Sequence, residues 1–127
     1  MADVVMVVDT GLAKVTDLLA AVTTVCPAWV GWGTGTIAPV VGNTGLGTPS
    51  AEARTVGTKT QETTTTTNDT YQVVALITAL SAQAITEVGV FDDLTAGNLF
   101  LRATFSAINV SIDDTVTFTI KTVFEQV

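Results

Sequence analysis

The chain has 127 residues, which corresponds to a single domain over residues 1–127, and its formal net charge of −7 disfavours nucleic acid and anionic membranes as partners. It contains no histidine and one cysteine, Cys26, so His-based catalytic triads, His metal sites and an intrachain disulfide are excluded.

The first segment, residues 1–8, is apolar and rich in residues that favour β-structure: Val4, Val5, Met6, Val7 and Val8. One interpretation is a docking arm that adds to an exposed sheet edge of a neighbouring protein through main-chain hydrogen bonds. The other is a strand of the chain's own sheet. An acidic residue near the N-terminus and the short apolar run disfavour a signal peptide, and no stretch is long enough to span a membrane. We therefore expect a soluble protein made in a cytoplasm.

A helix is expected over residues 9–25. Its apolar residues recur at intervals of three and four and so share one helical face: Leu12, Val15, Leu18, Leu19, Val22 and Val25. Asp9 and Thr10 are suitable N-terminal caps, and Pro27 is expected to mark the end of the helix.

The stretch GTGTIA, residues 33–38, matches the dinucleotide-binding pattern G-x-G-x-x-A. That pattern works only where the glycines open a helix whose N-terminus holds the pyrophosphate. Pro39 disfavours helical geometry at Ala38, and a long loop rich in Gly, Asn and Pro follows over residues 33–53. Glu52 comes too early to be the acidic residue of the pattern. We expect no nucleotide or other cofactor here, and glycines that allow a bend or a close backbone approach.

Trp29 and Trp32 lie at the start of this Gly-rich stretch. Indole rings can stack on a sugar or a base, which would make the pair a binding site. Beside a Gly-rich bend, however, tryptophan more often anchors packing. We expect both to lie in the core or in a contact between subunits.

The remaining chain, residues 28–127, has the pattern of β-structure. Expected strands are 58–67, 71–80, 84–91, 99–108 and 115–125. Turn signals separate them at Asn68-Asp69, in DDLTAGN (92–98) and in SIDD (111–114). The expected fold is mainly β, an antiparallel β-sandwich of jelly-roll type preceded by one helix.

Two pairs of carboxylates, Asp92-Asp93 and Asp113-Asp114, are the candidates for acid–base chemistry. Adjacent residues of a strand point to opposite faces, and both pairs lie in turns, where Asp bonds to its own backbone. We therefore expect no catalytic residue. A calcium site that uses Asp92, Asp93, Thr95 and Asn98 stays open, although the loop lacks the spacing and bidentate Glu of an EF-hand.

Glu87 is expected on the same strand face as Ile85 and Phe91, an apolar setting in which a carboxylate needs a partner. If DDLTAGN closes a hairpin, Arg102 lies nearly opposite. The sequence therefore predicts a structural ion pair between Glu87 and Arg102 rather than a catalytic carboxylate.

The order of the segments GLAKVTDLL, VGWGTGT, ITEVGVFD, LFLRATF and DDTVTFT resembles small bacteriophage virion proteins, a group that includes capsid decoration (cement) proteins and β-rich modules of tail fibres. The resemblance covers nearly the whole chain, and VGWGTGT and ITEVGVFD are its most specific parts. It implies a β-sandwich that binds other virion proteins such as the major capsid protein, often as a homotrimer.

Three functions stay open at this stage. A capsid decoration protein is favoured, because the chain lacks the long shaft or receptor regions of tail fibres. A small tail or tail-fibre component is the alternative. A carbohydrate-binding module is a more remote one, supported by the two tryptophans. The expected location is the virion, after synthesis in the host cytoplasm. The low charged fraction of 13% indicates large neutral surfaces and hence a homo-oligomer.

Overall fold

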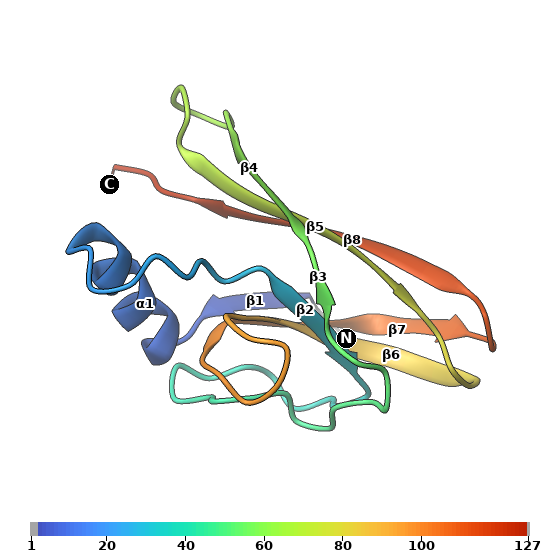
Figure 1. Ribbon diagram of the computed structural model, residues 1–127. Coiled ribbons are helices and arrows are strands. Elements are labelled where there is room, and N and C mark those ends of the chain that lie inside the picture. Colours follow the sequence, from blue (N-terminus) through green and yellow to red (C-terminus); the bar gives the residue numbers. More distant parts are fainter. Residues whose placement is uncertain (1–2, 127) are drawn as a thin grey trace.

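The computed structural model describes residues 3–126 as two antiparallel sheets with one helix beside them (Figure 1). The larger sheet has five strands in the order β1-β7-β6-β2-β3. Their bounds are Val4–Val7 (β1), Leu99–Val110 (β7), Gln83–Phe91 (β6), Trp29–Gly33 (β2) and Thr55–Val56 (β3). The expected β-sandwich with an N-terminal helix is confirmed.

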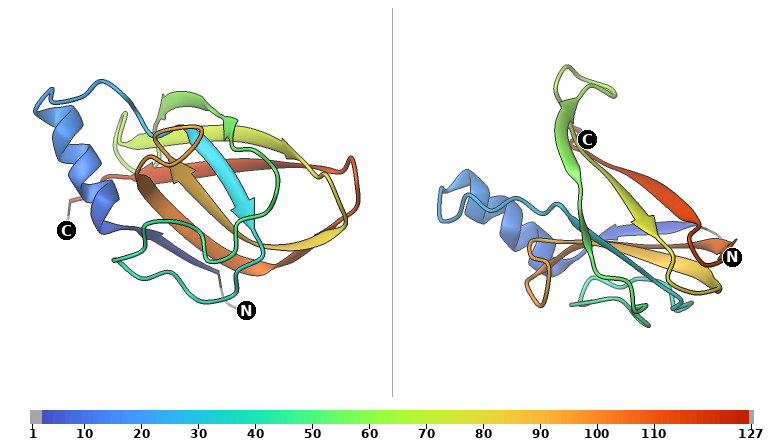
Figure 2. Two further views of the ribbon diagram at one scale, coloured as in Figure 1. Left: turned by 60° about the horizontal axis from the view of Figure 1, so that its bottom comes forward. Right: turned by 45° about the vertical axis from the view of Figure 1, so that its right-hand side comes forward.

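The smaller sheet has three strands in the order β4-β5-β8. Their bounds are Thr58–Glu62 (β4), Thr70–Thr78 (β5) and Thr115–Val123 (β8). The two sheets approach each other at the turns that join β5 to β6 and β7 to β8, and they diverge toward the helix and the C-terminal end (Figures 1 and 2). The sandwich is therefore closed at one end and open at the other.

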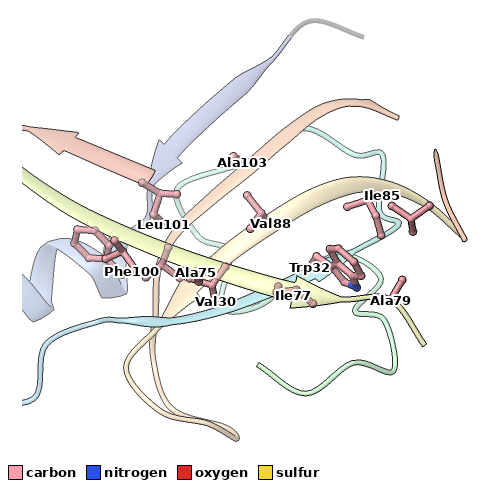
Figure 3. Packing of buried hydrophobic residues seen from close by; sticks show 13 residues of the cluster. Val30, Trp32, Ala75, Ile77, Ala79, Ile85, Val88, Phe100, Leu101 and Ala103 are labelled. Carbon is pink, nitrogen blue, oxygen red and sulfur yellow. The ribbon is translucent and has the colours of Figure 1, made fainter. Parts of the chain in front are cut away.

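The core lies between the sheets (Figure 3). Along β8 apolar and Thr residues alternate, so the apolar set faces the larger sheet, as expected for a strand with one covered face. Trp32 of β2 is the largest buried side chain of this core, and its ring meets Phe118 of β8 edge-on at 6.4 Å between centroids. The contact joins the central part of one sheet to the other.

A long loop between β2 and β3 forms a third layer. It runs across the face of the five-stranded sheet that points away from the three-stranded sheet (Figures 1 and 2). This loop carries most of the glycines between residues 31 and 57. The outer face of the larger sheet is thus covered by backbone rather than by a helix.

The N-terminal run forms β1, which pairs with β7 in antiparallel register, Val5 opposite Ala103. Val8, directly after the strand, is fully buried. The run is therefore a strand of the chain's own sheet, the second of the two interpretations, and the free docking arm over Val4, Val5, Met6, Val7 and Val8 is corrected accordingly. Main-chain pairing with β7 and the burial of Val8 hold it in place.

The helix α1 spans Asp9–Leu19 and is shorter than the expected 9–25. Ala21 adopts a left-handed conformation (φ 57°), and the N–H groups of Ala21 and Val22 donate to the carbonyls of Leu18 and Asp17. This arrangement is the Schellman motif, which ends a helix even where the apolar pattern continues. The cap residue is Val8 rather than Asp9 or Thr10.

The apolar face expected for this helix is buried only in part, at Val15, which packs against the core between the sheets, and at Leu18, which is half-buried. Leu12, Leu19, Val22 and Val25 are all more than half exposed. The residues that α1 buries fully are Gly11 and Lys14. A Cβ on Gly11 would lie 2.1 Å from the carbonyl oxygen of Phe100, so glycine allows the helix to approach β7. Lys14 binds Asp92 at 2.8 Å, an ion pair that the sequence did not indicate.

Candidate functional site

Glu87 lies on the outer face of the five-stranded sheet, beneath the long loop. A β-bulge between Ile85 and Glu87 changes the alternation of β6, so that Ile85 points into the core between the sheets and Glu87 points away from it. The expectation that Glu87 shares a face with Ile85 is therefore wrong. The bulge also directs the Thr86 hydroxyl to the loop, where it donates to the carbonyl of Gly35 at 2.7 Å.

The Glu87 carboxylate is fully buried and accepts hydrogen bonds from the loop and from β7. Backbone N–H groups of Gly35, Gly47 and Thr48 each donate to it at 2.7 Å. Arg102 of β7 donates from Nε at 3.0 Å and forms an ion pair at 3.0 Å. The structure thus brings together the two residues of the expected pair, placed diagonally on neighbouring strands because Glu87 is opposite Thr104.

Arg102 extends the network into the loop. Its guanidinium donates to the carbonyl of Ile37 at 2.9 Å and to the side-chain oxygen of Asn43 at 3.2 Å. Asn43 also accepts from the backbone N–H of Val40 at 2.9 Å. Two buried side chains of the sheet, Glu87 and Arg102, therefore hold the first part of residues 34–48 at Gly35 and Ile37. They hold the second part at Asn43, Gly47 and Thr48. We call residues 34–48 the clamped loop.

Burial alone would raise the pKa of the Glu87 carboxyl, because it disfavours the charged form. The hydrogen bonds from Thr48, Gly47, Gly35 and Arg102 outweigh that effect and lower the pKa below its usual 4.5. Glu87 is therefore a carboxylate in the folded protein at neutral pH. The geometry is that of an anion held by a structural nest of donors, with no space between carboxylate and donors for a substrate.

The glycines of the GTGTIA stretch serve this network. A Cβ on Gly33 would lie 2.3 Å from the carbonyl oxygen of Thr48, and one on Gly35 would lie 2.3 Å from a carboxylate oxygen of Glu87. No helix follows them, as the loop continues to the bridge between Gly33 and Pro49. The loop amide that would face a phosphate in a nucleotide site, that of Gly35, faces the protein's own carboxylate.

The clamped loop presents apolar side chains to solvent. Ile37 is 79% exposed, Val40 56% and Val41 55%, whereas Pro39 between them is buried. The loop is also tied to the start of α1, where the N–H of Asp9 donates to the carbonyl of Val41 at 2.8 Å. These residues are not among the sites expected from the sequence. The signal that could have found them is the apolar run IAPVV inside a segment otherwise rich in Gly, Asn and Thr.

The two tryptophans are placed as packing residues. Trp32 is 2% exposed, and its Nε1 donates to Glu52 at 2.9 Å. Glu52 also accepts from the N–H of Leu80 and from Gln83, which joins the end of the long loop to the turn between β5 and β6. Trp29 is half-buried against the small cluster formed by Val8, Phe91 and Leu99. The exposed paired rings that a sugar-binding platform needs are not formed by these two side chains.

The turn DDLTAGN is held by its own carboxylates. Asp92 binds Lys14 and accepts from the backbone N–H of Asn98 at 2.7 Å. Arg54 lies over the Phe91 ring at 3.4 Å and donates to two carbonyls of the turn. Of the carboxylates considered as calcium ligands, that of Asp92 is thus engaged by Lys14 and Asn98. Within residues 3–126, no group of three or more His, Cys, Asp or Glu residues could hold a metal ion.

Comparisons with family models, curated proteins and solved structures give no match to this chain. Within residues 3–126, no helix has the length and apolar character needed to cross a membrane.

Proposed function

We propose that the protein is a structural component of bacteriophage particles, and that it binds the head as a capsid decoration protein. The proposal is supported by the resemblance of its ordered segments to small virion proteins. It is further supported by a β-sandwich fold whose buried charged residues hold loops in place rather than surround a cavity. The proposed role is therefore recognition and stabilisation of a protein surface, without a chemical reaction.

The observation that carries the proposal is the clamped loop. A buried ion pair has a desolvation penalty, and here its hydrogen bonds are directed to a surface loop instead of the core between the sheets. The loop backbone is thereby fixed while Ile37, Val40 and Val41 remain exposed. A rigid loop loses little conformational entropy on binding, and exposed apolar side chains provide the contact area. Both properties suit a docking surface for a capsid protein.

Replacing Ile37 and Val41 by aspartate is expected to weaken binding to phage heads strongly without unfolding the protein. Each side chain is more than half exposed, so the charge costs little stability, whereas it would be buried in the complex. We expect the affinity for heads that lack the chain to fall by about a hundredfold, which corresponds to the loss of central interface residues. Binding is measured by co-sedimentation with those heads.

The matched control is Leu76→Asp. Leu76 is 48% exposed and lies on β5 in the three-stranded sheet, on the opposite side of the molecule from the loop. It introduces an aspartate at an exposed apolar residue, as each of the two loop substitutions does, and should bind heads as the unmodified chain does. Full binding by the loop variant, or an equal loss in the control, would count against the loop as the docking surface.

The alternative is a small component of the tail, which would use the same loop on a different virion protein. The resemblance also implies a homotrimer, whereas the surface composition requires only an oligomer. Fractionation of particles into heads and tails distinguishes the two locations, because the chain should follow the structure that it binds.

A further inference from the structure

The flank of the sandwich between β1 and β8 is open. A groove of about 560 Å³ runs along it between the two sheets. Its apolar lining comes from both sheets: Val5, Leu101, Ala103, Phe105, Phe118 and Ile120. These residues belong to the faces that form the core, so the groove is a part of the core that remains uncovered.

Val5 belongs to the core face of the larger sheet, yet no part of the smaller sheet covers its side chain in residues 3–126. In an antiparallel pair, residues opposite each other point to the same side of the sheet. Val5 is opposite Ala103, which is buried in the core, so Val5 also faces the three-stranded sheet. It is nevertheless 61% exposed, because in residues 3–126 the smaller sheet ends at β8 and has no further strand that would cover β1.

Both strands that border the groove are sheet edges. Within residues 3–126, β7 is the one strand that pairs with β1, and β5 is the one strand that pairs with β8. Edge strands of monomeric proteins are usually protected by charges, proline, bulges or a covering segment. Along its nine residues, Thr115–Val123, β8 carries one charged side chain, that of Lys121, and no proline.

The charges at the two borders complement each other. Asp3 lies on the β1 side of the groove and Lys121 on the β8 side. Within the described residues Lys121 forms no ion pair, whereas two of the five cations, Lys14 and Arg102, are buried in such pairs. With a net charge of −7, two copies repel each other, and a cation in the contact offsets part of that repulsion. A surface with one acid and one base on opposite borders is self-complementary under a two-fold axis.

We propose that this groove is the interface between two copies of the chain, related by a two-fold axis that passes through it. The β1 edge of each copy then faces the β8 edge of the other, Asp3 of each lies near Lys121 of its partner, and the four edges cover both Val5 side chains. Self-pairing through this groove leaves the clamped loop, on the outer face of the larger sheet, free for another protein.

The accessible surface area of the chain is larger than that of a compact monomer, which is consistent with a surface that a partner covers. The accessible surface is 6981 Å², whereas a compact monomer of this mass exposes roughly 6400 Å². A standard interface covers about 800 Å² on each partner, so the excess is of the order that one such contact requires. The proposal does not depend on the proposed function, since it concerns the purified chain alone.

The test is the mass of the purified chain in native mass spectrometry and sedimentation at micromolar concentration. We expect a species of twice the chain mass for the unmodified protein. Asp3→Lys places two lysines together across the axis and Lys121→Asp places two aspartates together, so each single variant should weaken dimerisation by about tenfold or more. The double variant exchanges the charges and should restore the dimer.

The matched control is Lys59→Asp, which makes the same change of charge on the exposed strand β4, away from the groove. It should dimerise as the unmodified chain does. A monomer at these concentrations, a species of three times the chain mass, or a double variant no better than either single variant would overturn the proposal. Failure of the unmodified chain to bind heads, with the dimer intact, would instead contradict the proposed function and leave this interface standing.

Discussion

Replacing Gly35 by alanine is expected to lower the free energy of unfolding by about 3 kcal/mol or more. The added Cβ would lie 2.3 Å from a carboxylate oxygen of Glu87, 2.8 Å from its carboxyl carbon and 3.0 Å from the backbone nitrogen of Thr48. Relief of the clash must move either a fully buried carboxylate or the loop that donates to it, and either movement breaks hydrogen bonds without access to water. Urea or thermal unfolding measures the loss.

The same loop supplies matched controls. At Gly42 and Gly45 an added Cβ would have no neighbouring atom within 4 Å, and neither glycine has a positive φ. Their replacement by alanine should change the free energy of unfolding by no more than about 0.5 kcal/mol, or increase it slightly by restricting the unfolded chain. If Gly35→Ala were as stable as Gly42→Ala, the close approach of loop and carboxylate would be wrong.

Replacing Glu87 by alanine is expected to cost about 3–5 kcal/mol, because it leaves the Arg102 guanidinium buried without a carboxylate. Arg102 would keep its bonds to Ile37 and Asn43, but three loop N–H groups would lose their acceptor. Glu62→Gln, at the end of β4, is the control and should be nearly neutral. A stable Glu87→Ala protein with an ordered loop would contradict the network.

The same carboxylate gives the protein a defined response to acid. The pKa of Glu87 is lower in the folded protein than its usual 4.5, so its contribution to stability is fully present above that value and is lost as the pH falls through the folded pKa. The pKa values of Glu52 and Asp92 are also lowered, since their hydrogen bonds outweigh burial, and their contributions are lost in the same direction. Glu87→Gln should therefore show a weaker loss of stability below pH 4.5 than the unmodified chain. An identical dependence on pH would exclude Glu87 as a contributor.

The β-structure and the ion pair could be predicted from the sequence because both depend on local patterns. Alternation in residues 115–125 gave the covered face of β8, and the spacing of Glu87 and Arg102 about a turn gave their proximity. The bulge in β6 could not be predicted, since one extra residue in a strand changes no composition. It decides that Glu87 faces the loop rather than the core.

The helix shows that a regular local pattern does not always predict packing. Its apolar period is regular, but of that face Val15 alone packs against the core cluster, Gly11 and Lys14 are the residues that the helix buries fully, and Ala21 ends it in a left-handed conformation. Periodicity predicts which residues share a face and not whether a sheet covers that face. The clamped loop has a sequence signal in its apolar run IAPVV, but the fixed position of that run could not be predicted, because it depends on Arg102 reaching Ile37 and Asn43 from a strand distant in sequence.

The most direct test of the proposed function is the copy number of the chain in purified phage particles, determined by quantitative mass spectrometry after heads and tails are separated. A capsid decoration protein should be recovered with the heads, in a fixed ratio to the major capsid protein that is close to a whole number of copies per capsomer. Recovery with tails in few copies, or absence from particles, would contradict it.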